Sequence, residues 1–248
     1  MLTIDSITSG YGQTKVVHDV SLTVPDDGVV AVLGHNGAGK TTLLRTAVGL
    51  IKPTSGTITF DGEDITSLAP HARIKRGMAY VPQGQKSFEQ LSTMENLQVV
   101  AEGIGRQARG RIDEALERFP ALVPFLDRQA GLLSGGQRQQ LSIARALITQ
   151  PKLLILDEPA EGIQPNVVAE IQQTIRDLAK EGVAVLLVEQ HMGFALSAAS
   201  EYAVMASGRV IQQGEGGATL VPDTPESITS GAHDMEEVEE KVRMALAI

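Results

Sequence analysis

The sequence predicts an α/β fold with a parallel sheet, an N-terminal antiparallel β layer and an inserted helical lobe. Three observations carry this prediction. Nearly continuous apolar runs recur along the chain, amphipathic helical patterns separate them, and the first sixty residues instead alternate polar and apolar side chains. Continuous apolar runs indicate strands buried on both faces, whereas alternation indicates a sheet with one exposed face.

The predicted parallel strands are five short runs rich in β-branched residues, at 29–34, 77–83, 152–159, 183–191 and 202–210. Residues 167–182 have the spacing of an amphipathic helix that covers such a sheet. Gly, Pro and Asp residues separate the three runs that predict the antiparallel layer, at 2–8, 16–24 and 56–62.

Strand patterns are absent between about residues 85 and 150. Ser92 and Glu95 form a capping-box pattern that starts a helix, and helical patterns continue with interruptions at Pro120 and Pro124. We expect this stretch to form a helical subdomain inserted into a domain of residues 1–220.

Composition limits the class of protein. The 248 residues contain no cysteine, which excludes disulfides, thiolate metal sites and cysteine nucleophiles. The net charge of −9 argues against a protein that coats nucleic acid. No apolar run approaches the ~20 residues that cross a bilayer, so we expect a soluble chain that would work at a membrane only by docking on another subunit.

Residues 221–248 differ from the rest, because seven acidic and two basic residues give this tail −5 of the net charge. Pro222 and Pro225 indicate a loop. Four apolar residues then follow at helical spacing, at Met235, Val238, Val242 and Leu246. We expect an acidic tail with a short terminal helix that lies against the body and is peripheral to catalysis.

The motif "GHNGAGKT" follows an apolar strand, opens a helix and matches the phosphate loop G-x-x-x-x-G-K-[ST]. Its backbone would wrap the phosphates of a nucleotide, Lys40 would reach the β and γ groups, and the Thr41 hydroxyl would bind Mg²⁺. A chance glycine-rich turn is the alternative. The residues expected to bind the nucleotide are Gly34, Asn36, Gly37, Gly39, Lys40, Thr41 and Thr42.

Asp157 and Glu158 end the predicted buried strand in "LLILDEP". Because side chains alternate along a strand, the two carboxylates should do different jobs. Asp157 would face Mg²⁺, and Glu158 would polarise the water that attacks the γ-phosphate. A pair that only caps the next turn is the alternative. His191 follows the next strand and could contact the γ-phosphate, although a lone His is more often structural.

A second glycine turn lies in "LLSGGQRQQLSIARAL", residues 132–147. Ser134, Gly135 and Gly136 would offer backbone amides to an anion at a helix start. The stretch contains no acid, His or Lys. It would therefore hold a phosphate without a base of its own.

These motifs together resemble the ATP-binding cassette ATPases. The phosphate loop, Gln83 after "YVP", "LSGGQ", "LLILDE" and His191 occur in that family's order and spacing over about residues 1–220. The resemblance implies a P-loop NTPase core, ATP and Mg²⁺. It implies Glu158, His191 and Gln83 as catalytic residues, and Thr41, Gln83 and Asp157 as metal ligands.

The resemblance also implies roles for two further places in the chain. Tyr11 would stack on adenine, with local packing as the alternative, and Gln83 would link the γ-phosphate site to the transport partner. The turn of Ser134, Gly135, Gly136 and Gln137 would cover the γ-phosphate of ATP bound to a second ATPase subunit, identical or related, so that two chains enclose two ATPs.

The loop "AEGIQPN" departs from the family's "SALD"-like pattern, with Gln164 at the usual Asp position, which leaves its contact across the dimer open. Together with "VEQH" it resembles importers of branched-chain amino acids and urea, and "EGIQP" is closest to urea-type subunits. The implied partners are transmembrane permeases and, indirectly, a solute-binding protein, without nucleic acid.

From this branch we expect a cytoplasmic subunit, peripheral on the inner face of the cell membrane, that hydrolyses ATP to import urea or short-chain amides. A branched-chain amino acid importer and a non-transport ATPase are the alternatives. A further alternative is a regulatory module that binds ATP without useful turnover, although Glu158 and the other catalytic positions are intact.

Overall fold

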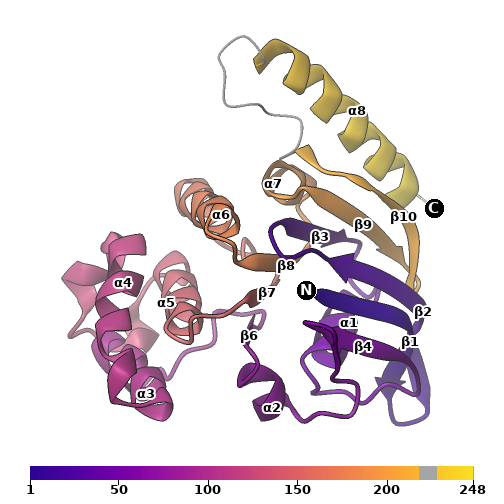
Figure 1. Cartoon of the computed structure of the whole chain (residues 1–248). Helices are drawn as coiled ribbons and strands as arrows, with labels where there is room; N and C mark the ends of the chain where they lie inside the picture. The colour runs from indigo at the N-terminus through magenta and orange to yellow at the C-terminus, as the bar shows by residue number, and fades with distance from the viewer. Residues whose placement is uncertain (218–227, 248) are drawn as a thin grey trace.

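The computed structural model describes residues 1–217 and 228–247, in which two sheets form the centre of the molecule (Figure 1). The larger sheet has the order β10-β9-β3-β8-β7-β6. Its strands are β3 (Val29–Leu33), β6 (Met78–Val81), β7 (Leu153–Asp157), β8 (Ala184–Glu189), β9 (Glu201–Ala206) and β10 (Arg209–Glu215). All neighbours pair in parallel except β10, which is antiparallel to β9.

The smaller sheet is the antiparallel layer that the sequence predicts. It has the order β2-β1-β4-β5, with β1 (Leu2–Tyr11), β2 (Thr14–Val24), β4 (Ser55–Phe60) and β5 (Glu63–Asp64). All three strand pairs are antiparallel. The α/β class, the parallel core and the antiparallel layer are therefore confirmed.

The run 202–210 is a hairpin, and the prediction of one strand there is wrong. Ser207 and Gly208 separate β9 from β10 with φ angles of 48° and 76°. Two successive residues with positive φ make the tight turn whose twist matches antiparallel strands. The apolar pattern runs on through this turn, which is why it suggested a single strand.

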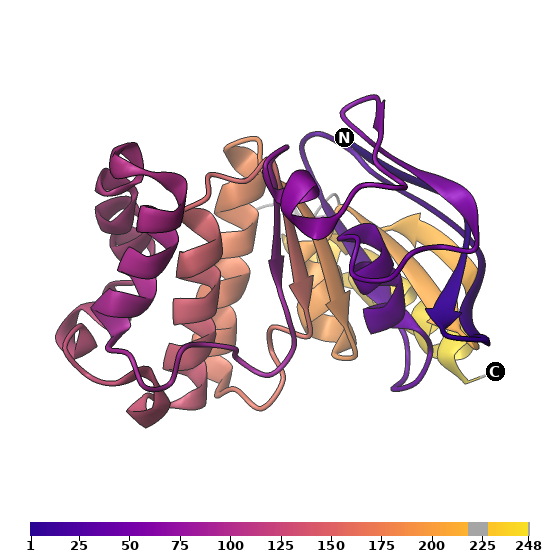
Figure 2. The same ribbon diagram turned by 90° about the horizontal axis from the view of Figure 1, so that it is seen from below.

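The larger sheet separates two hydrophobic cores. Val30 and Val32 of β3 pack with the antiparallel layer and with helix α1 (Lys40–Ala47). Ala31 and Leu33 point the opposite way and pack with the remaining helices. Figure 2 shows the helical lobe on one side of the parallel strands and the antiparallel layer on the other. This alternation explains why each strand reads as a continuous apolar run.

Helices α6 (Pro165–Lys180) and α7 (Met192–Ala198) cover the second face, and α2 (Pro70–Ile74) precedes β6. Ser92 starts the lobe with the predicted capping box to Glu95. The lobe consists of α3 (Thr93–Ile104), α4 (Gly110–Arg118) and α5 (Gly135–Leu147) with the 3₁₀ turns η1 (Arg106–Ala108), η2 (Pro120–Phe125) and η3 (Ala130–Leu132).

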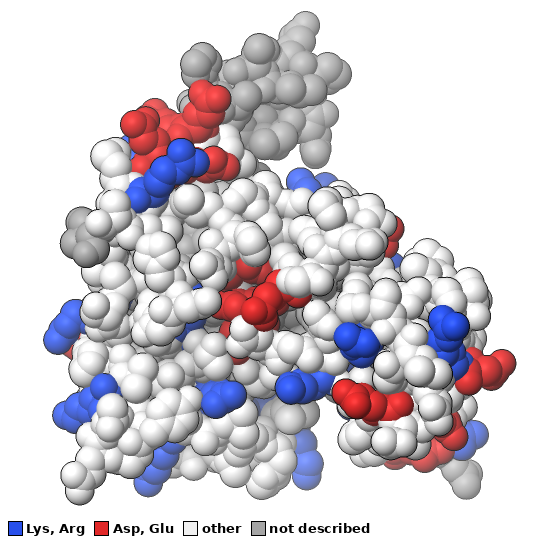
Figure 3. Space-filling model, turned by 180° about the vertical axis from the view of Figure 1, so that it is seen from behind, with Lys and Arg blue, Asp and Glu red and all other residues white. Residues whose placement is uncertain are grey.

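The tail contains helix α8 (Ile228–Leu246), which packs on α7, β9 and β10. Its Val242 is fully buried, whereas charged residues gather on its outer side, at the upper left of Figure 3. Glu237 and Lys241 of this helix form an ion pair. Pro222 and Pro225 lie outside the described residues. Within 1–217 and 228–247, no helix combines the length and the apolar character needed to cross a membrane.

Candidate functional site

The loop that joins β3 to α1 is shaped for an anion. Gly37 and Gly39 have φ angles of 84° and 103°, a region that favours glycine. Gly39 is the N-cap of α1, and no side chain caps this helix. The first-turn amides of a helix have no partners within the helix, and its positive end attracts phosphate. The N-terminus of α1 is thus available to an anion.

A cavity of about 300 Å³ lies over this loop. Eight of the residues predicted from the sequence line it, together with Val16, which was not predicted. The eight are Asn36, Gly37, Gly39, Lys40, Thr41, Thr42, Gln83 and Glu158. The structure thus brings residues from three distant segments of the chain to one place.

Lys40 is the cation of the cavity and is buried. Its Nζ donates to the backbone oxygens of Gly34 at 2.8 Å and His35 at 3.2 Å. It also lies 3.2 Å from Oε1 of Glu158, which is 8% exposed. A buried charge needs such a partner, so these two side chains neutralise each other in this arrangement. A phosphate would compete with Glu158 for the ammonium.

Asp157 lies at the end of β7 beneath the cavity. Its Oδ1 accepts from Thr41 Oγ1 at 3.2 Å, and its Oδ2 accepts from Tyr80 OH at 3.1 Å. Burial raises the pKa of Asp157, and the two hydroxyl donors oppose that rise. Thr41 and Asp157 together offer the hard oxygen ligands that suit Mg²⁺. Among the described residues, neither this site nor any other place has a cluster of three or more His, Cys, Asp or Glu that could hold a metal ion.

Glu158 adopts a φ of 48°, which is unusual for a residue with a side chain. Its carboxylate accepts from Gln83 Nε2 at 2.9 Å, and the same nitrogen donates to Glu161 Oε2 at 2.8 Å. Sequence reasoning missed Glu161, although it lies in the loop singled out for Gln164. Gln164 itself is the N-cap of α6 and makes no side-chain cap bond.

Glu189 was also missed. It is buried at the end of β8, where its carboxylate accepts from the backbone amides of Ala160 at 3.0 Å, Gln190 at 3.1 Å and His191 at 3.3 Å. Burial raises its pKa, and these amides oppose the rise. Glu189 therefore ties the loop after Glu158 to the loop that carries His191. An acid that ends an otherwise apolar strand was the available signal.

The second glycine turn lies apart from the cavity. Ser134 Oγ accepts from the Gln137 amide at 3.2 Å, and Gln137 Oε1 accepts from the Ser134 amide at 2.9 Å, so α5 begins with a capping box. Gly135 and Gly136 occupy its first turn. In the described part of the chain, no hydrogen bond or ion pair joins these four residues to the phosphate loop.

Tyr11 and His191 do not line the cavity either. The Tyr11 hydroxyl accepts from Arg45 Nη1 at 3.2 Å, and the ring is 49% exposed near α1. His191 is exposed and is the N-cap of α7. Neither position contradicts the role expected for it, and both roles stay predictions.

Three relatives and one solved structure show what the chain resembles. BraG of Pseudomonas aeruginosa, a high-affinity branched-chain amino acid transport ATP-binding protein, is 38% identical over 89% of this chain and 95% of its own. A probable branched-chain amino acid transport ATP-binding protein, LivF of Archaeoglobus fulgidus, is 37% identical over 94% and 100%. The lipopolysaccharide export system ATP-binding protein LptB of Haemophilus influenzae is 38% identical over 86% and 90%.

The structure of a nucleotide-free ATP-binding cassette from an ABC transporter matches with a TM-score of 0.80 at 27% identity, covering 96% of this chain and 97% of the other. The family model for ABC transporters matches residues 17–161. The chain therefore belongs to the ABC transporter family, as an ATP-binding subunit whose family couples ATP hydrolysis to transport.

Proposed function

We propose that this subunit hydrolyses ATP between two ATPase chains and thereby drives an importer. The observation that carries the proposal is the separation of two half-sites. Lys40, Gln83 and Glu158 converge on the phosphate-loop cavity, whereas the turn at Ser134 does not line it. One chain alone thus presents two anion-binding helix starts that do not share a ligand.

Within the cavity, the α1 amides and Lys40 bind the phosphates of ATP. Thr41, Asp157 and Gln83 would hold Mg²⁺, and the bound ion would neutralise phosphate charge. Glu158 accepts a proton from the attacking water. Its contact with Lys40 supports this role, because a phosphate that takes Lys40 frees the carboxylate. His191 contacts the γ-phosphate, and Tyr11 stacks on adenine.

The turn from Ser134 to Gln137 acts on ATP held by a second ATPase subunit. Its capping box supports this role, since the turn is ordered by its own side chains and requires no ligand within its chain. The amides of Gly135 and Gly136 lie in the first turn of α5, where the helix offers them no partner, and they would contact the phosphate. The partner is a copy of this chain or a related ATPase.

A trapping experiment tests this arrangement. Glu158→Gln should bind Mg-ATP without hydrolysing it and accumulate as a dimer, with itself or with its natural partner, because the phosphate clamp is intact. Adding Ser134→Arg should abolish the dimer and leave ATP binding by the monomer unchanged. Size-exclusion chromatography with and without Mg-ATP, beside a nucleotide titration, gives the readout.

Ser92→Arg in the same background is the matched control, because Ser92 starts α3 with the same capping box. It should leave the ATP-bound dimer intact. Dimer formation by the Ser134→Arg variant, or loss of ATP binding by its folded monomer, would contradict the proposal.

The permease would dock in a groove of about 420 Å³ between the lobe and the sheet edge. The groove is lined by Pro82 and Phe88, on either side of Gln83 in the chain, and by Arg145 of α5. This position supports the expected link between Gln83 and the transport partner. The subunit would then work at the cytoplasmic face of the membrane.

For the substrate, the relatives favour branched-chain amino acids, because two of them carry that name and neither these two nor LptB is named for urea. Urea or a short-chain amide is the second candidate, and "EGIQP" is the observation that favours it. Gene deletion followed by uptake of labelled leucine and labelled urea at low concentration separates the two. Loss of neither uptake would contradict both and favour an exporter such as the one that LptB serves.

A further inference from the structure

The C-terminal helix reaches the phosphate loop. The ring of His35 bonds through Nε2 to the backbone oxygen of Leu246 at 2.9 Å, although 211 residues separate the two. A carbonyl oxygen only accepts, so the imidazole donates from Nε2, and this contact fixes the proton position of the ring. The tail therefore reaches a residue of the phosphate loop, although His35 itself does not line the cavity, and the expectation that the tail is peripheral to catalysis stays a prediction.

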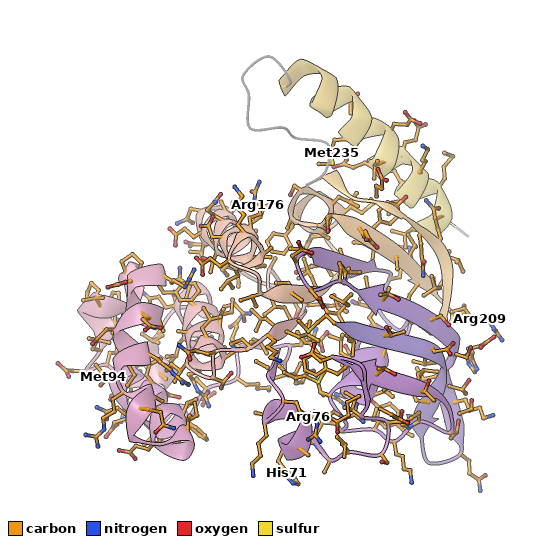
Figure 4. All side chains as sticks on the ribbon, viewed as in Figure 1. His71, Arg76, Met94, Arg176, Arg209 and Met235 are labelled. Carbon is orange, nitrogen blue, oxygen red and sulfur yellow. The ribbon has the colours of Figure 1, made fainter. Side chains whose placement is uncertain are left out.

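The body of the protein, rather than His35, sets the position of α8. Val242 is fully buried in the core, and Ala245 is only 8% exposed. Met235 and Val238 are partly buried and pack against the same core. Gly217 follows β10, and a Cβ there would lie 1.9 Å from Met235 Cε, so Met235 of α8 packs directly against this backbone (Met235 is labelled in Figure 4). The oxygen of Leu246 is thus presented by an anchored helix of about 28 Å.

The chemistry of the helix end favours this contact. The last four carbonyls of a helix have no partner within the helix, and they carry its partial negative charge. A histidine donor is suited to such an oxygen. His35 therefore acts as a cap for α8 that comes from a loop 211 residues away.

His35 also contacts the lysine of the phosphate loop. Its backbone oxygen accepts from Lys40 Nζ at 3.2 Å and from the Ala38 amide at 3.1 Å. Lys40 in turn lies 3.2 Å from Glu158. One residue thus contacts α8 with its ring and Lys40 with its carbonyl oxygen.

We propose that α8 holds the phosphate loop through His35, and that His35 is a positioning residue for ATP binding. The inference rests on the proposed assignment of the phosphate loop to ATP. It gives the C-terminal helix a function that its sequence did not suggest, which is to keep the loop in the conformation that receives phosphate.

The test uses two ways to remove the contact. His35→Ala removes the donor, and a chain that ends at Met244 removes the acceptor. Each should raise the KM for Mg-ATP by about 2- to 10-fold, the range of one hydrogen bond, with a smaller effect on kcat. In nucleotide-free protein, each should speed hydrogen exchange at residues 34–42. Combining the changes should be no worse than either alone, because they break the same contact.

Three controls belong to this test. His35→Gln places an amide donor near the Nε2 position and should restore the KM. A chain that ends at Leu246 keeps an oxygen acceptor there and should behave as the full chain. His71→Ala changes an exposed histidine of α2, labelled in Figure 4, and should have no effect.

Two results would overturn the proposal. In the first, the combined variant shows the product of the single effects, which means that His35 and α8 act independently. In the second, His35→Ala leaves both the KM and the exchange of residues 34–42 unchanged. Lys40→Ala separates this failure from a failure of the site assignment, because retention of ATP binding by that variant would contradict the phosphate-loop assignment itself.

Discussion

Helices α1 and α5 both begin at a turn that contains glycine, but their N-termini are capped differently. Helix α1 starts at Gly39 without a side-chain cap, and its first residue, Lys40, is buried beneath the cavity. Helix α5 starts at Ser134 with a complete capping box and lies outside the cavity. Both helix starts offer amides to an anion. In α5 the Ser134 hydroxyl already accepts from one of these amides, whereas α1 has no side chain that does so.

The difference suits the two helix starts to different tasks: α1 to binding ATP within its own chain, and α5 to contacting ATP that another chain has bound. An uncapped helix start beside a buried cation gains stability when phosphate arrives, so α1 is suited to hold ATP within its own chain. A capped start is ordered before any ligand arrives and is suited to a ligand that another chain brings. Three changes, one at each helix start and one between Thr41 and the sheet, break or sharpen this contrast.

The largest effect is expected at α1. Lys40→Ala removes the only cation that lines the cavity in the described structure and leaves Glu158 without its charged partner. We expect turnover to fall by at least about 100-fold and tight Mg-ATP binding to be lost. Lys152→Ala is the control, since Lys152 forms an exposed pair with Asp61 and should leave both within about 2-fold. Normal turnover by Lys40→Ala would contradict the contrast.

A smaller effect is expected where Asp157 supports Thr41. Burial raises the pKa of Asp157 in the folded protein, so the folded state binds more protons than the unfolded state above the unfolded value of about 3.9. Stability from this residue is therefore present at low pH and is lost as pH rises toward its folded pKa. The ionised carboxylate costs stability at neutral pH, which Mg²⁺ would offset.

Asp157→Asn removes that cost and keeps a polar partner for Thr41 and Tyr80. In nucleotide-free protein at pH 7.5, the unfolding temperature should rise by about 2–4 °C. This is the shift that a gain of about 1 kcal/mol in the free energy of unfolding produces in a chain of this size. The gain should be smaller at pH 4, because burial raises the pKa of the native carboxyl and so favours its protonated form as the pH falls. Asp127→Asn, at an exposed position, should change neither value. A gain of equal size at both pH values would contradict the burial argument.

The sequence was sufficient for those parts of the site that one local pattern specifies. The phosphate loop lies between a strand and a helix, and Asp157 and Glu158 end a strand, so their chemistry follows from position within one element. Ser134 and Gln137 likewise lie three residues apart and form their box locally. In each case the partners are neighbours in sequence.

The remaining contacts depend on segments that are distant in sequence. Gln83 divides one amide nitrogen between Glu158 and Glu161, and no spacing rule relates a strand end to a carboxylate 78 residues later. His35 and Leu246 meet only because α8 packs by its apolar stripe. Periodicity predicts which face of a helix is buried, but it does not say which loop receives the helix end.

The smallest effect is expected at α5, where it is also the most specific. Ser134→Ala removes one cap oxygen, which should cost about 1 kcal/mol and lower the unfolding temperature by about 2–4 °C. Ser92→Ala removes the same oxygen from the equivalent box of α3 and should lower it equally. In the Glu158→Gln background, only Ser134→Ala should weaken the ATP-bound dimer, which size-exclusion chromatography over a range of protein concentrations measures. Equal weakening by both variants would mean that dimer formation depends on the stability of the lobe rather than on the hydroxyl of Ser134. It would also mean that α5 does not contact a phosphate bound by the neighbouring chain.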